Sequence, residues 1–194
     1  MLKKIKISLL LIFLLGGLLQ AQPVKKIYLF FTNDLHARIG RQKDRFLNPN
    51  FPPMIGGGAS AATIIKSVKQ RAAKNGDLVL FFDGGDFLSK TSDLVKNSGG
   101  KAIIEYMNQM GYLAAVPGVE DFEVAGQKWN ELASLAQFPL LACNVQSNGT
   151  NPFKPYFIFE QNGLKIGVFG VLSQVVETIN ETEELQCFCF LPEL

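Results

Sequence analysis

The chain has 194 residues, of which 47% are hydrophobic and 19% are charged, a balance typical of a globular protein with a buried core. Its 19 basic and 17 acidic residues leave a formal net charge of +2, and no block of like charge indicates a nucleic-acid-binding surface. The sequence has no repeat or low-complexity tract of the kind that marks solenoid or disordered proteins.

Residues 1–21 have the pattern of a secretory signal peptide. Three lysines within the first six residues precede an apolar run from Ile7 to Leu19, and a small residue, Ala21, follows. A membrane anchor is the alternative, but the run is shorter than the roughly 20 residues that span a bilayer. We therefore expect cleavage after Ala21 and an exported protein of the periplasm, cell surface or extracellular space, with no integral membrane segment afterwards.

Strand and helix patterns then alternate along the chain. We expect strands at 27–32, 78–82, 113–116 and 140–145, and helices at 59–74, 101–110 and 129–136, with loops at 38–53 and 117–121. A hairpin of 156–160 and 164–171 follows, joined by an Asn-Gly turn. The alternation predicts an α/β fold in one domain over residues 22–180. Within it, Cys143 is expected to be a buried core thiol.

Acidic side chains follow two of the predicted strands. Asp34 and His36 come after the first strand, and two residues apart on an extended backbone they would project from one face. Asp83 and Asp86 follow the second strand, and the carboxyl ends of parallel strands share one sheet edge. We expect Asp34, His36 and Asp86 to meet there and bind a metal, since carboxylate and imidazole suit zinc or manganese. The alternative is an ordinary strand end and a turn made by aspartate and glycine.

Several motifs in this order resemble the secreted 5′-nucleotidase family. They are 32–39 (TNDLHARI), 57–59 (GGA), 83–87 (DGGDF), 116–118 (VPG) with 121–122 (DF), and 138–145 (FPLLACNV). The resemblance implies the N-terminal part of a calcineurin-like metallophosphoesterase, a two-sheet sandwich flanked by helices with two divalent ions at the strand ends. It also implies that Asp34 and His36 hold the first ion and that Asp86 bridges both. The substrate would be a small-molecule phosphate ester such as a nucleotide.

The chain departs from the family where the family usually reads Gly-Asn-His. Here the sequence is Gly118-Val119-Glu120, and Val119 offers no donor atom for a second metal. Glu120 and Glu123 stand at the positions of the family's catalytic His and Asp, so they are the catalytic candidates. Glu120 would act as a general acid only with a strongly raised pKa, to which a nearby carboxylate would contribute; otherwise it would become a metal ligand.

The resemblance also implies further metal-binding histidines beyond those seen here, whereas the chain contains one His. We therefore expect one divalent metal at most, such as zinc or manganese. The tail 181–194 resembles no part of the family, and either a gene truncation, a frameshift or a shortened lineage accounts for it. With only the N-terminal part of the two-sheet sandwich, apolar side chains of the hairpin would be exposed to solvent. We expect a partner chain to cover these residues, which are Phe157, Phe159, Val168, Phe169 and Val171.

Two functions are consistent with these observations. The first is an exported metal-dependent phosphoesterase that hydrolyses nucleotides or related phosphate esters. The second is a non-catalytic remnant or binding module that holds at most one metal ion.

Overall fold

The computed structural model describes residues 26–147, 151–172 and 188–190. The predicted signal peptide and most of the predicted tail lie outside these ranges. None of the helices in the described part of the chain has the length and apolar character that a membrane crossing requires.

A parallel three-stranded sheet forms the centre of the fold. Its strands are β1 (Ile27–Thr32), β4 (Leu78–Asp83) and β5 (Ala114–Ala115), with β4 in the middle. β1 and β4 pair in register from Ile27 with Leu78 to Thr32 with Asp83, so the two strands end side by side. Parallel neighbours need a crossover connection, and the helix between β1 and β4 supplies it. The predicted α/β class is confirmed.

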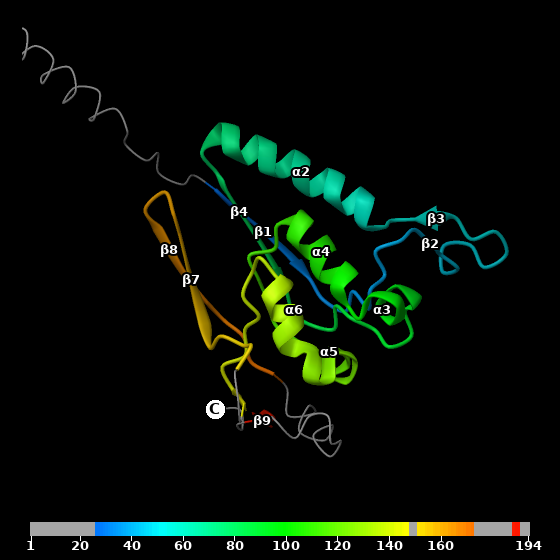
Figure 1. Cartoon of the computed structure of the whole chain (residues 1–194). Coiled ribbons are helices and arrows are strands. Elements are labelled where there is room, and N and C mark those ends of the chain that lie inside the picture. The colour runs from blue at the N-terminus through cyan, green and yellow to red at the C-terminus, as the bar shows by residue number, and fades with distance from the viewer. Residues whose placement is uncertain (1–25, 148–150, 173–187, 191–194) are drawn as a thin grey trace, which may run out of the picture.

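Helices cover one face of this sheet (Figure 1). The long ones are α2 (Gly58–Asn75) and α4 (Lys101–Met110), and the shorter ones are α3 (Asp93–Ser98), α5 (Val119–Ala125) and α6 (Trp129–Leu135), with a 3₁₀ turn at Gly126–Lys128. α4 buries the apolar stripe Ile103, Ile104, Met107 and Met110 in the main core. The three helices predicted at 59–74, 101–110 and 129–136 are confirmed as α2, α4 and α6. Their apolar stripes indicated helices that pack against another surface.

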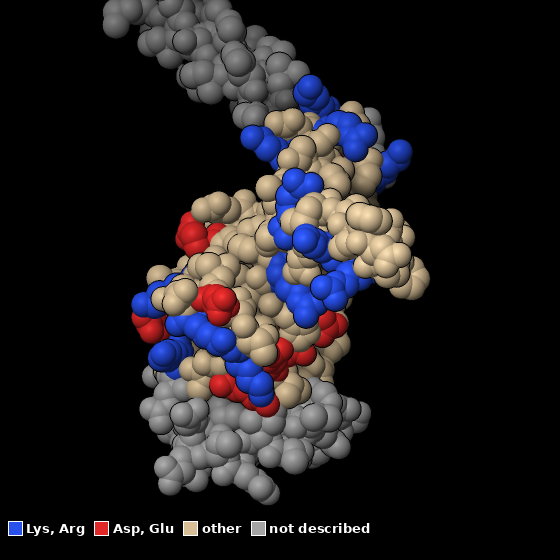
Figure 2. Space-filling view, turned by 90° about the vertical axis from the view of Figure 1, so that its right-hand side faces the viewer, with Lys and Arg blue, Asp and Glu red and all other residues tan. Residues whose placement is uncertain are grey.

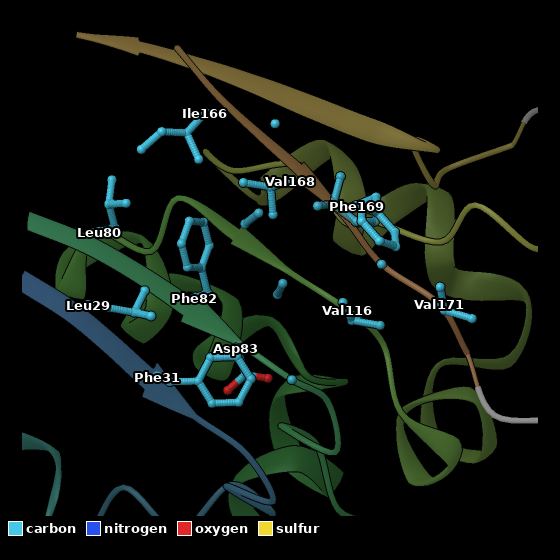
Figure 3. Close-up of a pocket in the computed structure, with 16 residues that line it drawn as sticks. Leu29, Phe31, Leu80, Phe82, Asp83, Val116, Ile166, Val168, Phe169 and Val171 are labelled. Carbon is cyan, nitrogen blue, oxygen red and sulfur yellow. The ribbon is translucent and has the colours of Figure 1, made fainter. Parts of the chain in front are cut away.

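The other face of the sheet is only partly covered. β7 (Tyr156–Gln161) and β8 (Leu164–Phe169) form the predicted hairpin, which stands over this face and leaves a cavity of about 480 Å³ (Figure 3). Side chains of β1 line the cavity, and Leu29 and Phe31 remain 65% and 63% exposed. Of the hairpin residues expected to need cover, Phe169 and Val171 are exposed and Phe157, Phe159 and Val168 are half-buried. Cover by a partner chain stays a prediction.

The structure corrects two predicted loops. Residues 38–53 were expected to be a loop, and most of them are, but Gln42 and Lys43 form β2 (Gln42–Lys43), which pairs with β3 (Met54–Ile55) just beyond that range in a small antiparallel hairpin. It projects from the body of the molecule in Figure 1 and belongs to the face that Figure 2 shows. Residues 117–121 were also expected to be a loop, but α5 begins at Val119, because Gly118 serves as its N-cap.

The predicted strand 140–145 is largely wrong. Leu140 and Leu141 form only isolated parallel bridges, and the strand is β6 (Val145–Ser147), which pairs with β9 (Phe188–Phe190). Cys143 is exposed rather than buried. The apolar run alone could not show that the chain turns between Ala142 and Val145.

Candidate metal site

Two loops run side by side beyond the ends of β1 and β4. The backbone N–H groups of Asp34, His36 and Ala37 donate to the carbonyl oxygens of Gly85, Asp86 and Phe87, at 2.9, 2.8 and 2.9 Å. These bonds continue the strand pairing past the point where the regular strands end.

The backbone in these loops is left-handed at non-glycine residues. The φ angles are 55° at Asp34, 45° at His36, 57° at Ala37 and 54° at Asp86. The prediction that Asp34 and His36 project together from an extended backbone is therefore wrong. Such conformations cost roughly 1–2 kcal/mol each and cluster at functional sites, where the surroundings hold them.

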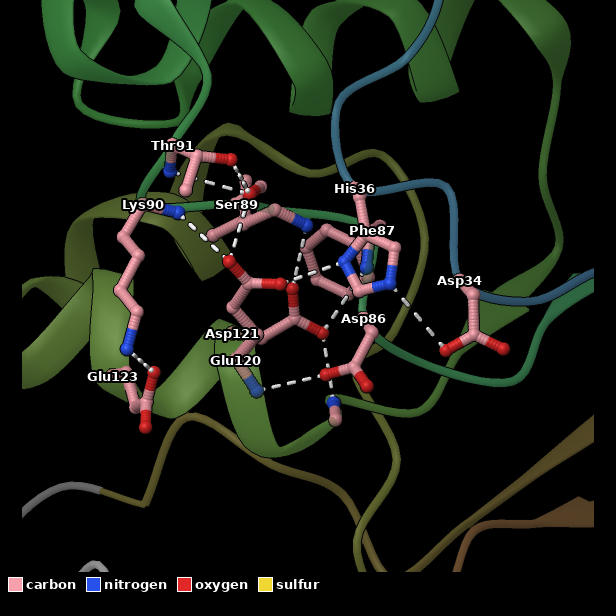
Figure 4. A network of polar contacts seen from close by, with 12 residues as sticks. Asp34, His36, Asp86, Phe87, Ser89, Lys90, Thr91, Glu120, Asp121 and Glu123 are labelled. Carbon is pink, nitrogen blue, oxygen red and sulfur yellow. Dashed lines mark hydrogen bonds and ion pairs between the residues drawn. The ribbon is translucent and has the colours of Figure 1, made fainter. Parts of the chain in front are cut away.

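Asp34 and His36 nevertheless face each other across a gap suited to an ion (Figure 4). Asp34 Oδ1 lies 3.7 Å from His36 Nε2, and the Asp34 side chain is 55% exposed. Its other oxygen accepts a hydrogen bond from the side-chain amide of Asn33. Ligand distances of about 2.0–2.2 Å would let one ion contact both atoms. The predicted proximity of these two residues is confirmed.

Glu120 holds the opposite side of the His36 ring. Its Oε2 lies 2.7 Å from His36 Nδ1, while its Oε1 accepts hydrogen bonds from Ser89 Oγ at 2.7 Å and Lys90 N at 3.1 Å. Nδ1 is buried and has the Glu120 carboxylate as its near neighbour, although the contact lacks the alignment of a good hydrogen bond. With Nδ1 turned to Glu120, Nε2 is left facing Asp34.

The charge state of Glu120 is opposite to the one a general acid needs. Partial burial raises its pKa, but the hydrogen bonds from Ser89 and Lys90 and the contact with His36 lower that pKa overall. A strongly raised pKa at Glu120 was the condition for its predicted acid role, and that condition is not met.

Glu123 does not supply the second carboxylate expected beside Glu120. It lies one turn further along α5 and forms an ion pair with Lys90 at 2.6 Å. Lys90 thus neutralises Glu123, while the backbone N–H of Lys90 binds Glu120.

Asp86 lies in the loop after β4, and its Oδ1 accepts a hydrogen bond from the Glu120 N–H in the first turn of α5 at 2.8 Å. Gly118 packs so closely that a Cβ on it would overlap Asp86. Within residues 26–147, 151–172 and 188–190, no three His, Cys, Asp or Glu side chains converge as a metal-binding group. The donors are of the right chemistry for a divalent ion and two are in reach of one, but the role of Asp86 as third ligand stays a prediction.

Asp121 supports the site, although the sequence assigned it no role. It is fully buried, and its carboxylate accepts backbone N–H groups from Leu88 at 2.6 Å and Gly118 at 2.8 Å. Burial raises its pKa well above the ordinary value, against these bonds. By joining the loop after β4 to the start of α5, Asp121 places Glu120 against His36. An acidic residue three positions after a helix N-cap is the signal that identifies it.

Asp83 is the structural residue that the turn interpretation predicted. Its oxygens accept hydrogen bonds from Thr32 Oγ1 at 2.5 Å and from Gly85 N at 2.9 Å, and Thr32 also contacts the Tyr112 hydroxyl at 2.8 Å. Burial raises the pKa of Asp83 to about 6 against these hydrogen bonds, with a smaller contribution from the charges of Asp34 and Asp86.

Comparison with known proteins confirms the predicted resemblance. No family model matches the chain. Protein UshA of Escherichia coli is 28% identical over 162 residues, which are 81% of this chain and 27% of UshA. A 5′-nucleotidase of Vibrio cholerae is 26% identical over 168 residues, 84% of this chain and 28% of that protein. The chain thus spans little more than a quarter of the length of these relatives.

Solved structures show the same fold. The 5′-nucleotidase precursor of Thermus thermophilus superposes with a TM-score of 0.69 at 21% identity, over 84% of this chain and 31% of that one. The calcineurin-like phosphoesterase YfkN of Bacillus subtilis gives a TM-score of 0.59 at 22% identity, over 84% and 53%. The arrangement of the described elements is therefore that of calcineurin-like phosphoesterases.

Proposed function

We propose that this chain is the metal-binding part of an exported hydrolase of phosphate esters, nucleotides foremost, and that it holds one divalent ion through Asp34 and His36, with Asp86 as a third ligand. The observation that carries the proposal is the 3.7 Å separation of Asp34 Oδ1 and His36 Nε2 at the joined ends of β1 and β4. The fold of calcineurin-like phosphoesterases and the similarity to a 5′-nucleotidase support the substrate class. Export is supported by the pattern of residues 1–21.

Glu120 is a positioning residue in this proposal rather than an acid or a ligand. A carboxylate on one ring nitrogen of a metal-binding histidine fixes the tautomer and leaves the other nitrogen free for the ion. Glu120 contacts Nδ1, and two hydrogen bonds from Ser89 and Lys90 hold its carboxylate in place. The pKa of Glu120 is lowered, so it keeps the charge this role needs.

The chemistry follows from the side chains that surround the ion. A bound divalent ion would polarise a phosphate ester and lower the pKa of a water molecule. Asp34 is exposed enough to admit a ligand, whereas His36 is held from behind by Glu120. Asp86 Oδ1 is held by the Glu120 N–H and packed against Gly118, so only a small adjustment of the Asp34 and His36 side chains or of the other Asp86 oxygen would complete a three-ligand site.

Binding of metal without turnover is the second candidate. It is favoured by Val119, whose aliphatic side chain cannot replace the asparagine that the family places there, and by a Glu120 that stays ionised. Losing one member of a catalytic group typically costs several orders of magnitude in rate. A partner chain that covers the apolar residues on the open sheet face would stabilise either candidate.

Calorimetric titration of the purified protein with Mn²⁺ and Zn²⁺ tests the metal site. We expect one ion per chain, with affinity lost in Asp34→Asn and reduced in Asp86→Asn. Asp93→Asn is the matched control, because Asp93 is an exposed aspartate of α3 paired only to Lys96. Unchanged binding in Asp34→Asn would overturn the proposal.

Phosphate release from AMP by the same samples separates the two candidates. Release that depends on the added ion and disappears in Asp34→Asn would identify a hydrolase. Binding of the ion without release would identify the second candidate.

A further inference from the structure

The tip of the β2–β3 hairpin, residues 44–53, exposes large apolar side chains. Phe46 is 95% exposed, Phe51 83% and Leu47 65%, and within the described ranges nothing covers them. The hairpin stands away from the helices and the sheet, so these side chains do not serve the core (Figure 1). Exposed apolar clusters on a soluble domain mark interaction sites.

The tip has a defined conformation built by two short turns. Asp44 Oδ1 accepts the backbone N–H groups of Phe46 at 2.8 Å and Leu47 at 3.2 Å. Asn48 Oδ1 accepts those of Asn50 at 3.1 Å and Phe51 at 2.9 Å. Asp44 N donates to Pro53 O at 2.9 Å and closes the loop. Because the turns already hold the aromatic rings outward, little ordering cost remains when the tip binds a surface.

Basic side chains flank the apolar tip. Residues 38–55 contain Arg38, Arg41, Lys43 and Arg45 against one acidic residue, Asp44, whose side chain is engaged in the turn. All four cations are exposed. Figure 2 shows Lys and Arg side chains gathered on the face that carries this hairpin.

We infer that the hairpin tip docks onto an anionic lipid bilayer, with Phe46, Leu47 and Phe51 in the interface and the flanking cations on the lipid phosphates. Aromatic and aliphatic side chains beside Lys and Arg are the combination that binds at such interfaces. A second copy of the chain fits less well, because a symmetric pair of tips would bring like charges together. Such docking would keep the metal site of an exported protein close to a membrane surface, although it does not depend on that site.

Tryptophan fluorescence at the tip tests the inference. Phe46→Trp places a reporter in the full-length chain, whose one natural tryptophan, Trp129, is buried. We expect the emission of this tryptophan to shift to the blue with phosphatidylglycerol–phosphatidylcholine vesicles and to be quenched when those vesicles contain brominated lipid. Neither effect should occur with vesicles of phosphatidylcholine alone. A reporter at Phe169→Trp, another exposed aromatic position (69% exposed against 95% for Phe46) on the β7–β8 hairpin, should not respond. A chain that begins at Gln22 should give the same signal, because the inference places the contact at the tip and not in the apolar run of residues 1–21.

Two variants of the Phe46→Trp protein separate the contributions. Changing Arg41, Lys43 and Arg45 to Gln should weaken the vesicle affinity by about fivefold per charge. Changing Phe51 to Ser should weaken it further at unchanged charge. Four outcomes would overturn the inference. The fluorescence could respond equally to neutral vesicles, or fail to respond to anionic ones. The blue shift could appear on raising the protein concentration alone, or the protein could bind a single-stranded oligonucleotide more tightly than the vesicles.

Discussion

Two aspartates of the site, Asp121 in the first turn of α5 and Asp34 in the loop after β1, differ in burial and in the partners of their carboxylates. Asp121 is fully buried, and backbone N–H groups from two segments occupy its carboxylate. Asp34 is more than half exposed, and one of its oxygens faces His36 across an open gap. A carboxylate that a fold uses for structure is saturated by the backbone, whereas one that can bind an ion keeps a lone pair accessible. The contrast distinguishes Asp121, which holds the structure of the site together, from Asp34, which is available to bind an ion.

Removing Asp121 should produce the largest effect on stability. Asp121→Ala would leave the N–H groups of Leu88 and Gly118 without an acceptor in a buried position, which should cost about 3 kcal/mol or more of unfolding free energy. Chemical denaturation measures the loss. Asp121→Asn, which keeps one acceptor oxygen, should be intermediate. If Asp121→Ala were as stable as the parent, the structural role assigned to Asp121 would be wrong.

Asp83 should make stability depend on pH. Its pKa is about 6 in the folded protein and 3.8 ordinarily, so the folded state holds the proton more tightly. The unfolding free energy should therefore fall by about 3 kcal/mol from this group as pH rises from about 4 to about 6. Comparing Asp83→Asn with the parent in chelator isolates this slope, because the Asn oxygen can accept from Gly85 N while its NH₂ donates to Thr32 Oγ1, whose own proton can turn to Tyr112. Parallel pH profiles for the two proteins would contradict the assignment.

Glu120→Ala should weaken metal binding by about 10–100-fold, the usual effect of losing a carboxylate behind a ligating histidine. Glu123→Ala is the matched control, because Glu123 lies on the same helix and pairs with Lys90 instead of His36. Calorimetry with Zn²⁺ measures both. An equal loss in the two variants would mean that α5, rather than the Glu120 carboxylate, is responsible.

Asp34→Asn should change the stability of the fold least and should greatly weaken metal binding. The side chain is exposed, and asparagine also tolerates the left-handed backbone at this position, so the unfolding free energy should change by less than about 0.5 kcal/mol. Denaturation and metal titration of one preparation give both values. A loss of unfolding free energy close to that of Asp121→Ala would show that Asp34, like Asp121, has a structural role.

The sequence predicted the central elements because their patterns are long and local. The apolar strands at 27–32 and 78–82 and the amphipathic helix at 101–110 were all found with bounds that differ by at most a residue. The resemblance pointed to Asp34 and His36, which lie together. These features depend on residue type and period, which a sequence displays directly.

The rest of the site depends on contacts between distant segments. The left-handed backbone at Asp34 and His36 is held by the carbonyl groups of Gly85 and Asp86. The pairing of Glu120 with His36 requires α5 to begin at Val119, which in turn requires Asp121 to bind the loop after β4. A local capping pattern marks Asp121, but no local pattern shows which loop it binds or that Glu120 faces His36, so Glu120 was assigned an acid role that its surroundings do not support.

Nitrogen NMR of the histidine ring tests the central claim most directly. The chain contains one His, so the two ring signals of a ¹⁵N-histidine sample belong to His36 without ambiguity. On addition of Zn²⁺ we predict a metal-induced shift at Nε2 with Nδ1 protonated and facing Glu120, and the shift at Nε2 should be absent in Asp34→Asn. A ring that does not respond to the ion, or one that binds it through Nδ1, would contradict the account.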